Sequence, residues 1–202
     1  MRATINLFNS DCLPAMRKMV DNQYGLAIVD PPFGIGYENG GQYFNKLQGK
    51  KWDKPPTKEY FNELFRISKN QIIWGGNYFA LPPTRGIIAW TKTVELKDRT
   101  FSEWEMAWTS FDKVARWIDL KPFQRNNTRI NPCQKPIQLY KWLLKNYAKP
   151  GDKILDTYFG SLSVGIACWD YGYDLDAFEI DRDYFEAGKK RLDVHRAQLQ
   201  IY

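Results

Sequence analysis

Histidine and cysteine are scarce in this 202-residue sequence, which contains one histidine and three cysteines. Cys12, Cys133 and Cys168 cannot all pair within one chain, and no two of them have the spacing Cys-x-x-Cys. The sequence therefore speaks against a disulfide scaffold and a structural zinc site, and we expect no metal. A reducing compartment, the cytoplasm, is the expected location. His195 is isolated and receives no predicted role.

Long apolar runs and linkers are also missing. No stretch approaches the roughly 20 apolar residues that cross a bilayer, and residues 1–8 lack the charged-then-apolar layout of a secretory signal. We therefore expect no membrane partner. The sequence shows no repeat, low-complexity tract or Gly/Ser linker, and its hydrophobic fraction of 44% suffices for a core. The simplest prediction is a single domain over residues 1–202.

Positive charge and aromatic residues are what the composition offers instead. The formal net charge is +6, and aromatic residues make up 16% of the chain, including eight tryptophans. A cationic chain suits a polyanionic partner such as nucleic acid, although many proteins with a similar charge bind none. Aromatic rings can stack on bases, but most tryptophans lie in protein cores. Composition alone thus leaves nucleic-acid binding open.

Short apolar runs that resemble buried strands alternate with helical patterns along the chain. Strands are predicted over Ile5–Phe8, Leu26–Val29, Gln71–Trp74, Gly86–Trp90, Lys153–Leu155 and Leu175–Phe178. Helices are predicted over Lys58–Ser68, Pro136–Tyr147, Ser161–Tyr171 and Arg182–Ala197. This alternation predicts an α/β fold with a mostly parallel sheet that is covered on both faces.

Two segments do not follow this pattern. Gly34 to Pro56 is rich in Gly, Asn, Gln and Lys, whereas Thr91 to Arg129 mixes eight lysines and arginines with aromatic residues. Because function in α/β folds lies on loops beyond the carboxyl ends of strands, we expect substrate recognition in these segments. A solvated charged surface over an ordinary core is the alternative for any single Lys or Arg.

The sequence Asp30-Pro31-Pro32-Phe33 directly follows the apolar run Leu26–Val29. A carboxylate at the end of a buried strand is costly unless it has partners, and two prolines fix the backbone and remove two amide donors. Asp30 and the Pro31 carbonyl can each accept one N–H of an amino group on a flat heterocycle, while Phe33 stacks on the ring. The alternative is a strand-ending turn with a packed phenylalanine.

A second motif, Asp156-Thr157-Tyr158-Phe159-Gly160-Ser161, lies between a predicted strand and a predicted helix. A glycine at such a turn lets the backbone approach a ligand, and the helix N-terminus offers free N–H groups. Glu179 follows the next strand, close to the roughly 20-residue offset at which an acid meets ribose hydroxyls. The combination predicts a nucleoside-binding half, with a purely structural turn as the alternative.

A third motif, Asn131-Pro132-Cys133-Gln134-Lys135-Pro136, is a proline-bracketed loop that leads into a helix. Taken by itself, it indicates only a helix start.

Together, the three motifs resemble those of the beta group of DNA amino-methyltransferases, specifically the small phage-type members. Asp30–Phe33 resembles the catalytic Asp-Pro-Pro-Tyr/Phe motif, which comes early in that group. Residues 131–136 are similar to His-Pro-Thr-Gln-Lys-Pro, and residues 156–161 to Asp-Pro-Phe-x-Gly-Ser. Asn9–Cys12 and Ile72–Phe79 resemble two further segments of the group. The resemblance runs from about residue 5 to about residue 192.

The resemblance implies a doubly wound, Rossmann-like sheet of the S-adenosylmethionine-dependent methyltransferase type, permuted so that the catalytic half comes first. It implies methylation of a flipped base in double-stranded DNA, at N6 of adenine, by direct transfer from S-adenosylmethionine. The implied catalytic residues are Asp30, Pro31, Pro32 and Phe33. The implied cofactor-binding residues are Asp11, Cys12, Asp30, Gln134, Lys135, Pro136, Asp156, Phe159, Gly160, Ser161, Glu179 and Ile180.

Three positions depart from the family pattern: Asn131, Cys133 and Leu162 replace the usual histidine, threonine and second glycine. Leu162 could narrow the loop near the cofactor. Cys133 falls in the cofactor-type motif, so we do not expect it to act as a nucleophile on C5 of cytosine. The two recognition segments are short, which suggests a short DNA target or help from a second subunit in a homodimer.

Several alternatives remain at this stage. N4 of cytosine is the second candidate acceptor, although N4-cytosine members more often carry serine at the position of Asp30. RNA and protein-glutamine methyltransferases favour Asn-Pro-Pro-Tyr after the cofactor motif, so residue and order argue against them. A nicotinamide-dependent oxidoreductase would leave the Pro-Pro motif unexplained. A DNA-binding module without catalysis would retain the fold.

Overall fold

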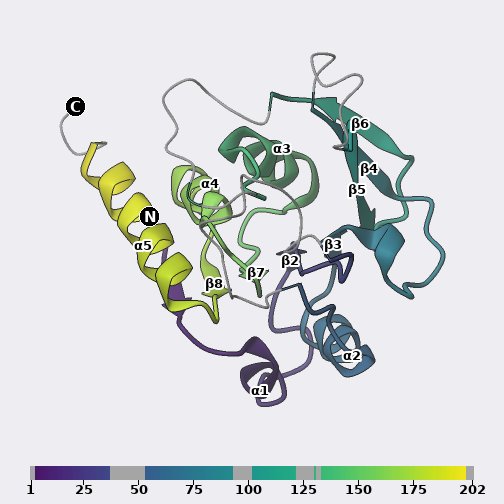
Figure 1. Cartoon of the computed structure of the whole chain (residues 1–202), viewed down its shortest axis with the longest axis horizontal. Coiled ribbons are helices and arrows are strands. Elements are labelled where there is room, and N and C mark those ends of the chain that lie inside the picture. Colours follow the sequence, from purple (N-terminus) through teal and green to yellow (C-terminus); the bar gives the residue numbers. More distant parts are fainter. Residues whose placement is uncertain (1–2, 37–52, 93–101, 122–129, 131–132, 199–202) are drawn as a thin grey trace.

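A mixed β-sheet forms the centre of the structure (Figure 1). The computed structural model describes residues 3–36, 53–92, 102–121, 130 and 133–198. Within this part of the chain, eight strands lie in the order β1-β8-β7-β2-β3-β5-β4-β6. They are β1 (Ile5–Phe8), β2 (Leu26–Val29), β3 (Gln71–Trp74), β4 (Ile87–Thr91), β5 (Trp104–Thr109), β6 (Arg116–Asp119), β7 (Ile154–Asp156) and β8 (Leu175–Phe178).

The sheet is doubly wound about the boundary between β7 and β2. From β2 the chain continues outward to β3, whereas from β7 it continues outward in the opposite direction to β8, which pairs with β1. These five strands are parallel to one another, whereas β5 pairs antiparallel with both β3 and β4. The predicted doubly wound, mostly parallel and permuted sheet is thereby confirmed.

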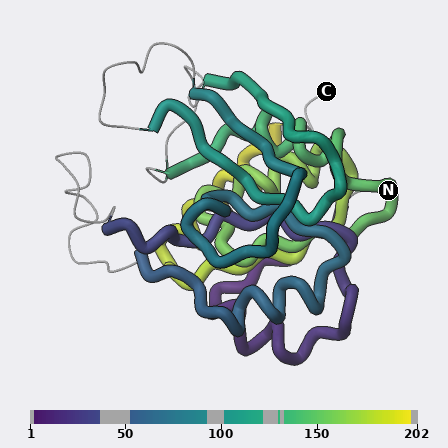
Figure 2. Tube along the Cα trace, turned by 90° about the vertical axis from the view of Figure 1, so that its right-hand side faces the viewer, coloured from purple at the N-terminus to yellow at the C-terminus, as the bar shows by residue number. Residues whose placement is uncertain are grey.

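Helices cover both faces of the sheet (Figures 1 and 2). In Figure 1, α1 and α2 lie below the sheet, and in Figure 2 the purple and blue parts of the tube lie at the bottom of the molecule. The core on the opposite face contains residues of α3, α4 and α5. The elements are α1 (Cys12–Met16), α2 (Lys58–Ile67), the 3₁₀ turn η3 (Gly76–Tyr78), α3 (Ile137–Tyr147), α4 (Ser163–Tyr171) and α5 (Arg182–Gln198). No helix of the described residues is long and apolar enough to span a membrane.

Strand β2 shows why the central strands are continuous apolar runs. Leu26 and Ile28 pack in the core under α3 and α4, whereas Ala27 and Val29 pack in the core under α1 and α2. Side chains alternate between the two faces of a strand, and both faces are covered here, so every position of β2 is buried.

Local sequence signals set several helix ends. The hydroxyl of Thr57 accepts the N–H of Tyr60 and caps the start of α2. Helix α4 ends at Gly172, whose φ of +78° is the left-handed conformation that glycine adopts without steric cost.

Strands β1, β2, β3 and β8 have the predicted bounds, and β4 and β7 each lie one residue later than predicted. The prediction that Thr91 to Arg129 lies outside the α/β pattern was wrong, since β5 and β6 belong to the sheet. Strand β5 carries Glu105 between apolar neighbours, so its sequence lacks the apolar run of a buried strand. Residues 37–52, 93–101 and 122–129 of the two predicted recognition segments lie outside the described residues.

Helix α3 offers a test of the packing on the sheet face opposite α1 and α2. Leu143 is completely buried, so we expect Leu143→Ala to lower the free energy of unfolding by roughly 2–5 kcal/mol. Lys145→Ala, on the same helix but exposed, is the matched control and should change it by less than about 1 kcal/mol. Urea denaturation followed by circular dichroism measures both, and equal losses would contradict the described packing.

Candidate active site

Three carboxylates meet at the carboxyl edge of the sheet. Asp30 directly follows β2, Asp156 ends β7, and Glu179 directly follows β8. Because β2, β7 and β8 are consecutive parallel neighbours, their carboxyl ends lie side by side. Asp30 and Asp156 flank the point where the winding of the sheet reverses, which is where open α/β sheets bind ligands.

Asp30 forms an ion pair with Lys135, from the loop that precedes α3. The ammonium contacts Oδ2 of Asp30, and within the described residues Oδ1 of Asp30 accepts no hydrogen bond. The side chain of Lys135 is 2% exposed and that of Asp30 is 19% exposed. Burial raises the pKa of the Asp30 carboxyl and Glu105 raises it further, while Lys135 acts in the opposite direction.

Lys135 is shared with a second carboxylate that sequence reasoning missed. Its ammonium lies 3.1 Å from Oε2 of Glu105 on β5, and Oε1 of Glu105 lies 2.5 Å from the ammonium of Lys92. Burial opposes the charge of Glu105, but Lys135 and Lys92 outweigh it and lower the pKa of this carboxyl. A lone acid inside an otherwise apolar strand was the available signal, because such a charge needs buried partners.

Phe33 lies in an aromatic group at the same edge. Its ring stacks on that of Tyr78 at 4.9 Å between centroids and meets Phe79 edge-on at 6.3 Å. Gly75, with φ of +68°, allows this approach, because a Cβ built there would lie 2.2 Å from the Phe33 ring. Pro31 is buried and Pro32 is half-buried, so the Asp-Pro-Pro-Phe turn is held by packing.

The Asp156 carboxylate is buried beneath this edge. Its Oδ1 accepts the N–H of Tyr158 at 3.0 Å. Burial raises the pKa of Asp156 to about 8, and the nearby charges of Asp30 and Glu179 act in the same direction. The hydroxyl of the next residue, Thr157, is 2.5 Å from that of Tyr60 on α2.

Glu179 and Gly160 form the turn expected for a nucleoside. Oε2 of Glu179 accepts the N–H of Gly160 at 3.0 Å, and Oε1 accepts the N–H of Asp181 at 2.8 Å. Each carboxylate oxygen retains a further lone pair that can accept a ribose hydroxyl. Gly160 has φ of +50°, and the neighbouring Ile180 leaves 67% of its surface exposed, which suits an apolar ring. These residues fit a nucleoside-type ligand.

Asp11, Cys12 and Phe159 have structural contacts at the same edge. Asp11 caps α1 by accepting the N–H of Leu13 at 3.0 Å. Cys12 is buried, and this burial raises the pKa of its thiol to about 12, which makes it a poor nucleophile. Phe159 is buried against Phe185 of α5, with 5.8 Å between ring centroids.

Hydrogen bonds join the loop before α3 to the start of α4. Ser163 donates its hydroxyl to the carbonyl of Lys135 at 2.8 Å. Arg191 of α5 donates to the carbonyl of Ser161 at 2.8 Å and to the hydroxyl of Ser163 at 2.9 Å. Gln134 accepts the N–H of Ile130 at 3.0 Å, and Pro136 is buried at the start of α3. Ser163 and Arg191 therefore link the second motif to the third.

Leu162 adopts a left-handed backbone conformation, which favours glycine. Its φ of +56° and ψ of +33° are left-handed, which costs a non-glycine residue roughly 1–2 kcal/mol. The side chain is completely buried and packs against Gly165. Leu162 thus occupies the core beneath the turn.

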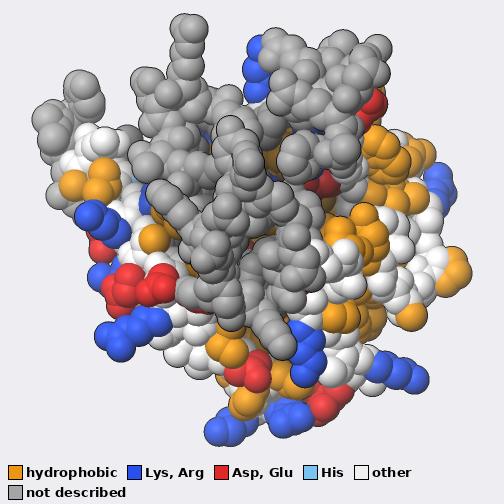
Figure 3. All heavy atoms as spheres, viewed as in Figure 1, with side chains coloured by type: hydrophobic (Ala, Val, Ile, Leu, Met, Phe, Trp, Pro, Cys, Tyr) orange, Lys and Arg blue, Asp and Glu red, His pale blue; other side chains and the backbone are white. Residues whose placement is uncertain are grey.

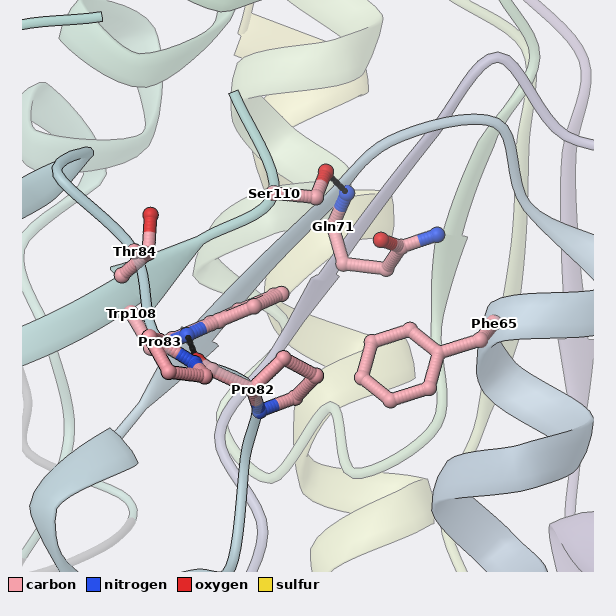
Figure 4. Close-up of a pocket in the computed structure, with 7 residues that line it drawn as sticks. All are labelled: Phe65, Gln71, Pro82, Pro83, Thr84, Trp108 and Ser110. Carbon is pink, nitrogen blue, oxygen red and sulfur yellow. Dashed lines mark hydrogen bonds between the residues drawn. The ribbon is translucent and has the colours of Figure 1, made fainter. Parts of the chain in front are cut away.

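A shallow pocket of about 270 Å³ lies elsewhere in the structure (Figure 4). Figure 4 shows Gln71, at the amino end of β3, bonded through its N–H to the hydroxyl of Ser110, and the indole of Trp108 bonded to the Pro82 carbonyl. None of the seven lining residues titrates, and Asp30 lies at the opposite, carboxyl edge of the sheet. The pocket lacks the groups that the chemistry of Asp30 would need.

The described part of Thr91 to Arg129 has both exposed and structural side chains. Figure 3 shows hydrophobic side chains gathered on the side of the molecule where β4, β5 and β6 lie. Trp104 is 49% exposed and Trp117 is 71% exposed, whereas Trp108 is buried. Arg116 donates to Asn146 of α3 at 2.9 Å, so this cation fastens β6 to α3.

Comparison with known proteins places this architecture among the enzymes that modify DNA. The profile of the DNA methylase family, which comprises the N6 and N4 methyltransferases, matches residues 74–190. The chain belongs to this family and is a DNA methyltransferase. Within the described residues, no group of three or more His, Cys, Asp or Glu side chains could hold a metal ion.

Individual relatives span nearly the whole chain. The type II methyltransferase M.HpaI of Haemophilus parainfluenzae is 22% identical over 93% of this chain and 74% of its own length. The crystal structure of the M1.HpyAVI–SAM complex has a TM-score of 0.62 at 21% identity, covering 94% of this chain and 100% of that one. The cytosine-N4-specific PvuII DNA methyltransferase also has a TM-score of 0.62, at 12% identity, covering 97% and 93%.

The buried Asp156 carboxyl makes a pH-dependent prediction. Its pKa is about 8 in the folded protein against an ordinary 3.8, so the folded state retains a proton that the unfolded state loses. Unfolding therefore releases this proton, and the contribution of Asp156 to stability falls between about pH 4 and about pH 8. Asp156→Asn, which stays neutral, should gain stability over the wild type as pH rises through this range and hold that gain above it.

Thermal unfolding at half-unit pH intervals measures this difference. Asp119→Asn, an exposed aspartate at the end of β6, is the control for general charge effects. A gap between Asp156→Asn and wild type that stays constant from pH 4 to 8 would contradict the buried, protonated state of Asp156.

Proposed function

We propose that this protein transfers a methyl group from S-adenosylmethionine to N6 of adenine in double-stranded DNA. The observation that carries the proposal is the Asp30 carboxylate, which Lys135 holds through one oxygen and whose other oxygen accepts no hydrogen bond from the described residues. Asp30 rather than serine at this position favours adenine over cytosine. N4 of cytosine is the alternative acceptor, and PvuII methyltransferase of the same fold is specific for it.

The turn formed by Asp30–Phe33, the catalytic turn of this proposal, orients the amino group of the base. Oδ1 of Asp30 and the carbonyl of Pro31 each accept one of its N–H groups, which directs the nitrogen lone pair away from the ring plane. The ring of Phe33 stacks on the base and fixes that plane. No nucleophilic side chain is required, in keeping with the raised thiol pKa of buried Cys12.

The nucleoside turn holds the cofactor in this proposal. Glu179 accepts the ribose hydroxyls, Ile180 packs on the adenine of the cofactor, and Gly160 admits it close to the backbone. Eight further residues surround the cofactor in this proposal: Asp11, Cys12, Asp156, Phe159, Ser161, Gln134, Lys135 and Pro136. When bound, S-adenosylmethionine would supply an electrophilic methyl group and its sulfur would keep the electron pair of the broken S–CH₃ bond. The amino nitrogen that gains the methyl group would lose one proton, which the Asp30 carboxylate would accept.

The target adenine reaches Asp30 only after leaving the DNA helix, because its amino group is otherwise paired inside the duplex. We assign DNA recognition to residues 34–56 and 91–129 of a single methyltransferase domain over residues 1–202. Both ends of the first segment lie beside the catalytic turn, since the N–H of Gly34 donates to Asp53 at 2.7 Å. The second segment includes exposed Trp104 and Trp117. A homodimer would extend this short recognition surface.

The reaction and the role of Asp30 are tested together. Incubation with labelled S-adenosylmethionine and unmethylated DNA, followed by digestion to nucleosides, should yield N6-methyladenine. Asp30→Ala removes one of the two acceptors of the amino group and should lower the rate on the order of 100- to 1,000-fold. Asp174→Ala, an exposed aspartate on another loop, is the control and should retain activity.

Each other product has a defined meaning. If the wild type forms N4-methylcytosine and Asp30→Ala does not, the mechanism stands and cytosine replaces adenine as the acceptor. Methylated DNA formed equally well by Asp30→Ala would refute the role of Asp30.

Cofactor binding is tested at Glu179. Glu179→Gln weakens a charged acceptor of the ribose hydroxyls, so we expect the Kd for S-adenosylmethionine to rise roughly 10- to 100-fold. Isothermal titration calorimetry measures this value, with Glu186→Gln on the exposed side of α5 as the matched control. An unchanged Kd in Glu179→Gln would place the ribose elsewhere.

A further inference from the structure

Four charged side chains of alternating sign form a row that begins at the catalytic turn. They are, in order, Asp30, Lys135, Glu105 and Lys92. Lys135 contacts Asp30, its ammonium is 3.1 Å from Glu105, and Glu105 is 2.5 Å from Lys92. They come from four separate places in the chain: the end of β2, the loop before α3, strand β5 and the end of β4. Their formal charges sum to zero.

The register of β5 determines where Glu105 lies. Glu105 pairs with Trp90 of β4, and Ala107, two residues later on the same face, packs in the core with Trp74 and Trp90. This is the face on which Lys135 lies, since its ammonium is 5.1 Å from the centroid of the Trp74 ring. The pairing of β5 with β4 therefore places Glu105 beside Lys135.

The Lys135 ammonium has its donors occupied by this arrangement. It faces Asp30, Glu105 and the Trp74 ring, and its side chain is 2% exposed. An ammonium carries three N–H donors, and a buried cation is stabilised only when its donors are paired. Lys135 is thus a fixed charge, and its pKa is raised by Asp30 and Glu105 against the effect of burial.

We propose that Glu105 is a positioning residue for methyl transfer, which holds Lys135 between two carboxylates so that Asp30 remains a strong acceptor. The proposal rests on the role of Asp30 in the proposed function. If Lys135 paired with Asp30 alone, its full positive charge would act on that carboxylate and weaken its bond to the amino group of the base. The negative charge of Glu105 offsets part of the positive charge of Lys135, and the positive charge of Lys92 offsets that of Glu105.

Two further titratable groups face Asp30, namely Asp156 at the end of the neighbouring strand β7 and Tyr140 on α3. Burial raises the pKa of both, and the charge of Asp30 raises it further. Glu105 raises the pKa of the Asp30 carboxyl, whereas Lys135 and Lys92 lower it. Glu105→Gln should therefore lower the pKa of Asp30, and Lys92→Met should raise it, so the two substitutions have opposite signs.

The first experiment is the pH dependence of kcat. The acid limb reports ionisation of Asp30 in the enzyme–substrate complex, so it should move to lower pH in Glu105→Gln and to higher pH in Lys92→Met. At the optimum, kcat of Glu105→Gln should fall roughly 10- to 100-fold, with a smaller change in KM for DNA. Glu186→Gln, an exposed glutamate on α5 outside both recognition segments, is the matched control.

If kcat falls in both variants but the acid limb stays at the pH of the wild type, the proposal is overturned, because the effect is then merely structural. Shifts of the same sign in both variants would also overturn it. Should Glu105→Gln fail to fold, the direction of the shift in Lys92→Met decides.

The second experiment needs no turnover. Carbon-13 NMR titration of the Asp30 carboxyl in the unliganded full-length protein should show the same opposite shifts, with Asp30→Asn identifying the resonance. If these shifts are present but no methylated nucleoside forms, the proposed function fails while the charge arrangement stands. If methylation depends on Asp30 but neither substitution shifts its titration, the proposed function stands and the role of Glu105 is refuted.

Discussion

The ion pair between Asp30 and Lys135 is the contact on which the geometry of the site depends. It joins residues 105 positions apart in the chain, one at the end of β2 and the other before α3. A carboxylate at the end of a buried strand needs such a partner. The carbonyl of Lys135 in turn accepts from Ser163, and Arg191 of α5 holds the same serine. One electrostatic requirement thus links β2 to α4 and α5 on the sheet face opposite α1 and α2.

Much of the fold could be predicted because helices cover both faces of the sheet. The central strands are therefore continuous apolar runs that can be recognised in the sequence. Leu26–Val29 and Gln71–Trp74 are apolar at nearly every position and are strands with the predicted bounds. Strand β5 escaped prediction since Glu105 is stabilised by lysines that only the folded chain brings near. Strand β6 escaped because it lies at an edge of the sheet and most of its side chains are exposed.

The site was predictable to the extent that topology alone brings residues together. Parallel neighbouring strands end at one edge, so Asp30, Asp156 and Glu179 meet there as their positions after strands indicate. Glu105 and Lys92 reach the site through the antiparallel register of β5 with β4. No local motif encodes that pairing, because it depends on contacts between distant segments. For the same reason the left-handed turn at Leu162 showed in the sequence only as a departure from the family pattern.

The order of strands in the sheet also bears on how the protein emerges from the ribosome. Strand β1 pairs with β8, about 170 residues later in the chain, and β2 pairs with β7, which also lies in the last third. Chains synthesised amino end first fold as their contacts become available. Strands β1 and β2 of the nascent chain therefore wait for the synthesis of β8 and β7 before gaining these neighbours. During this interval the apolar strand β2 lacks one of its two neighbours in the sheet.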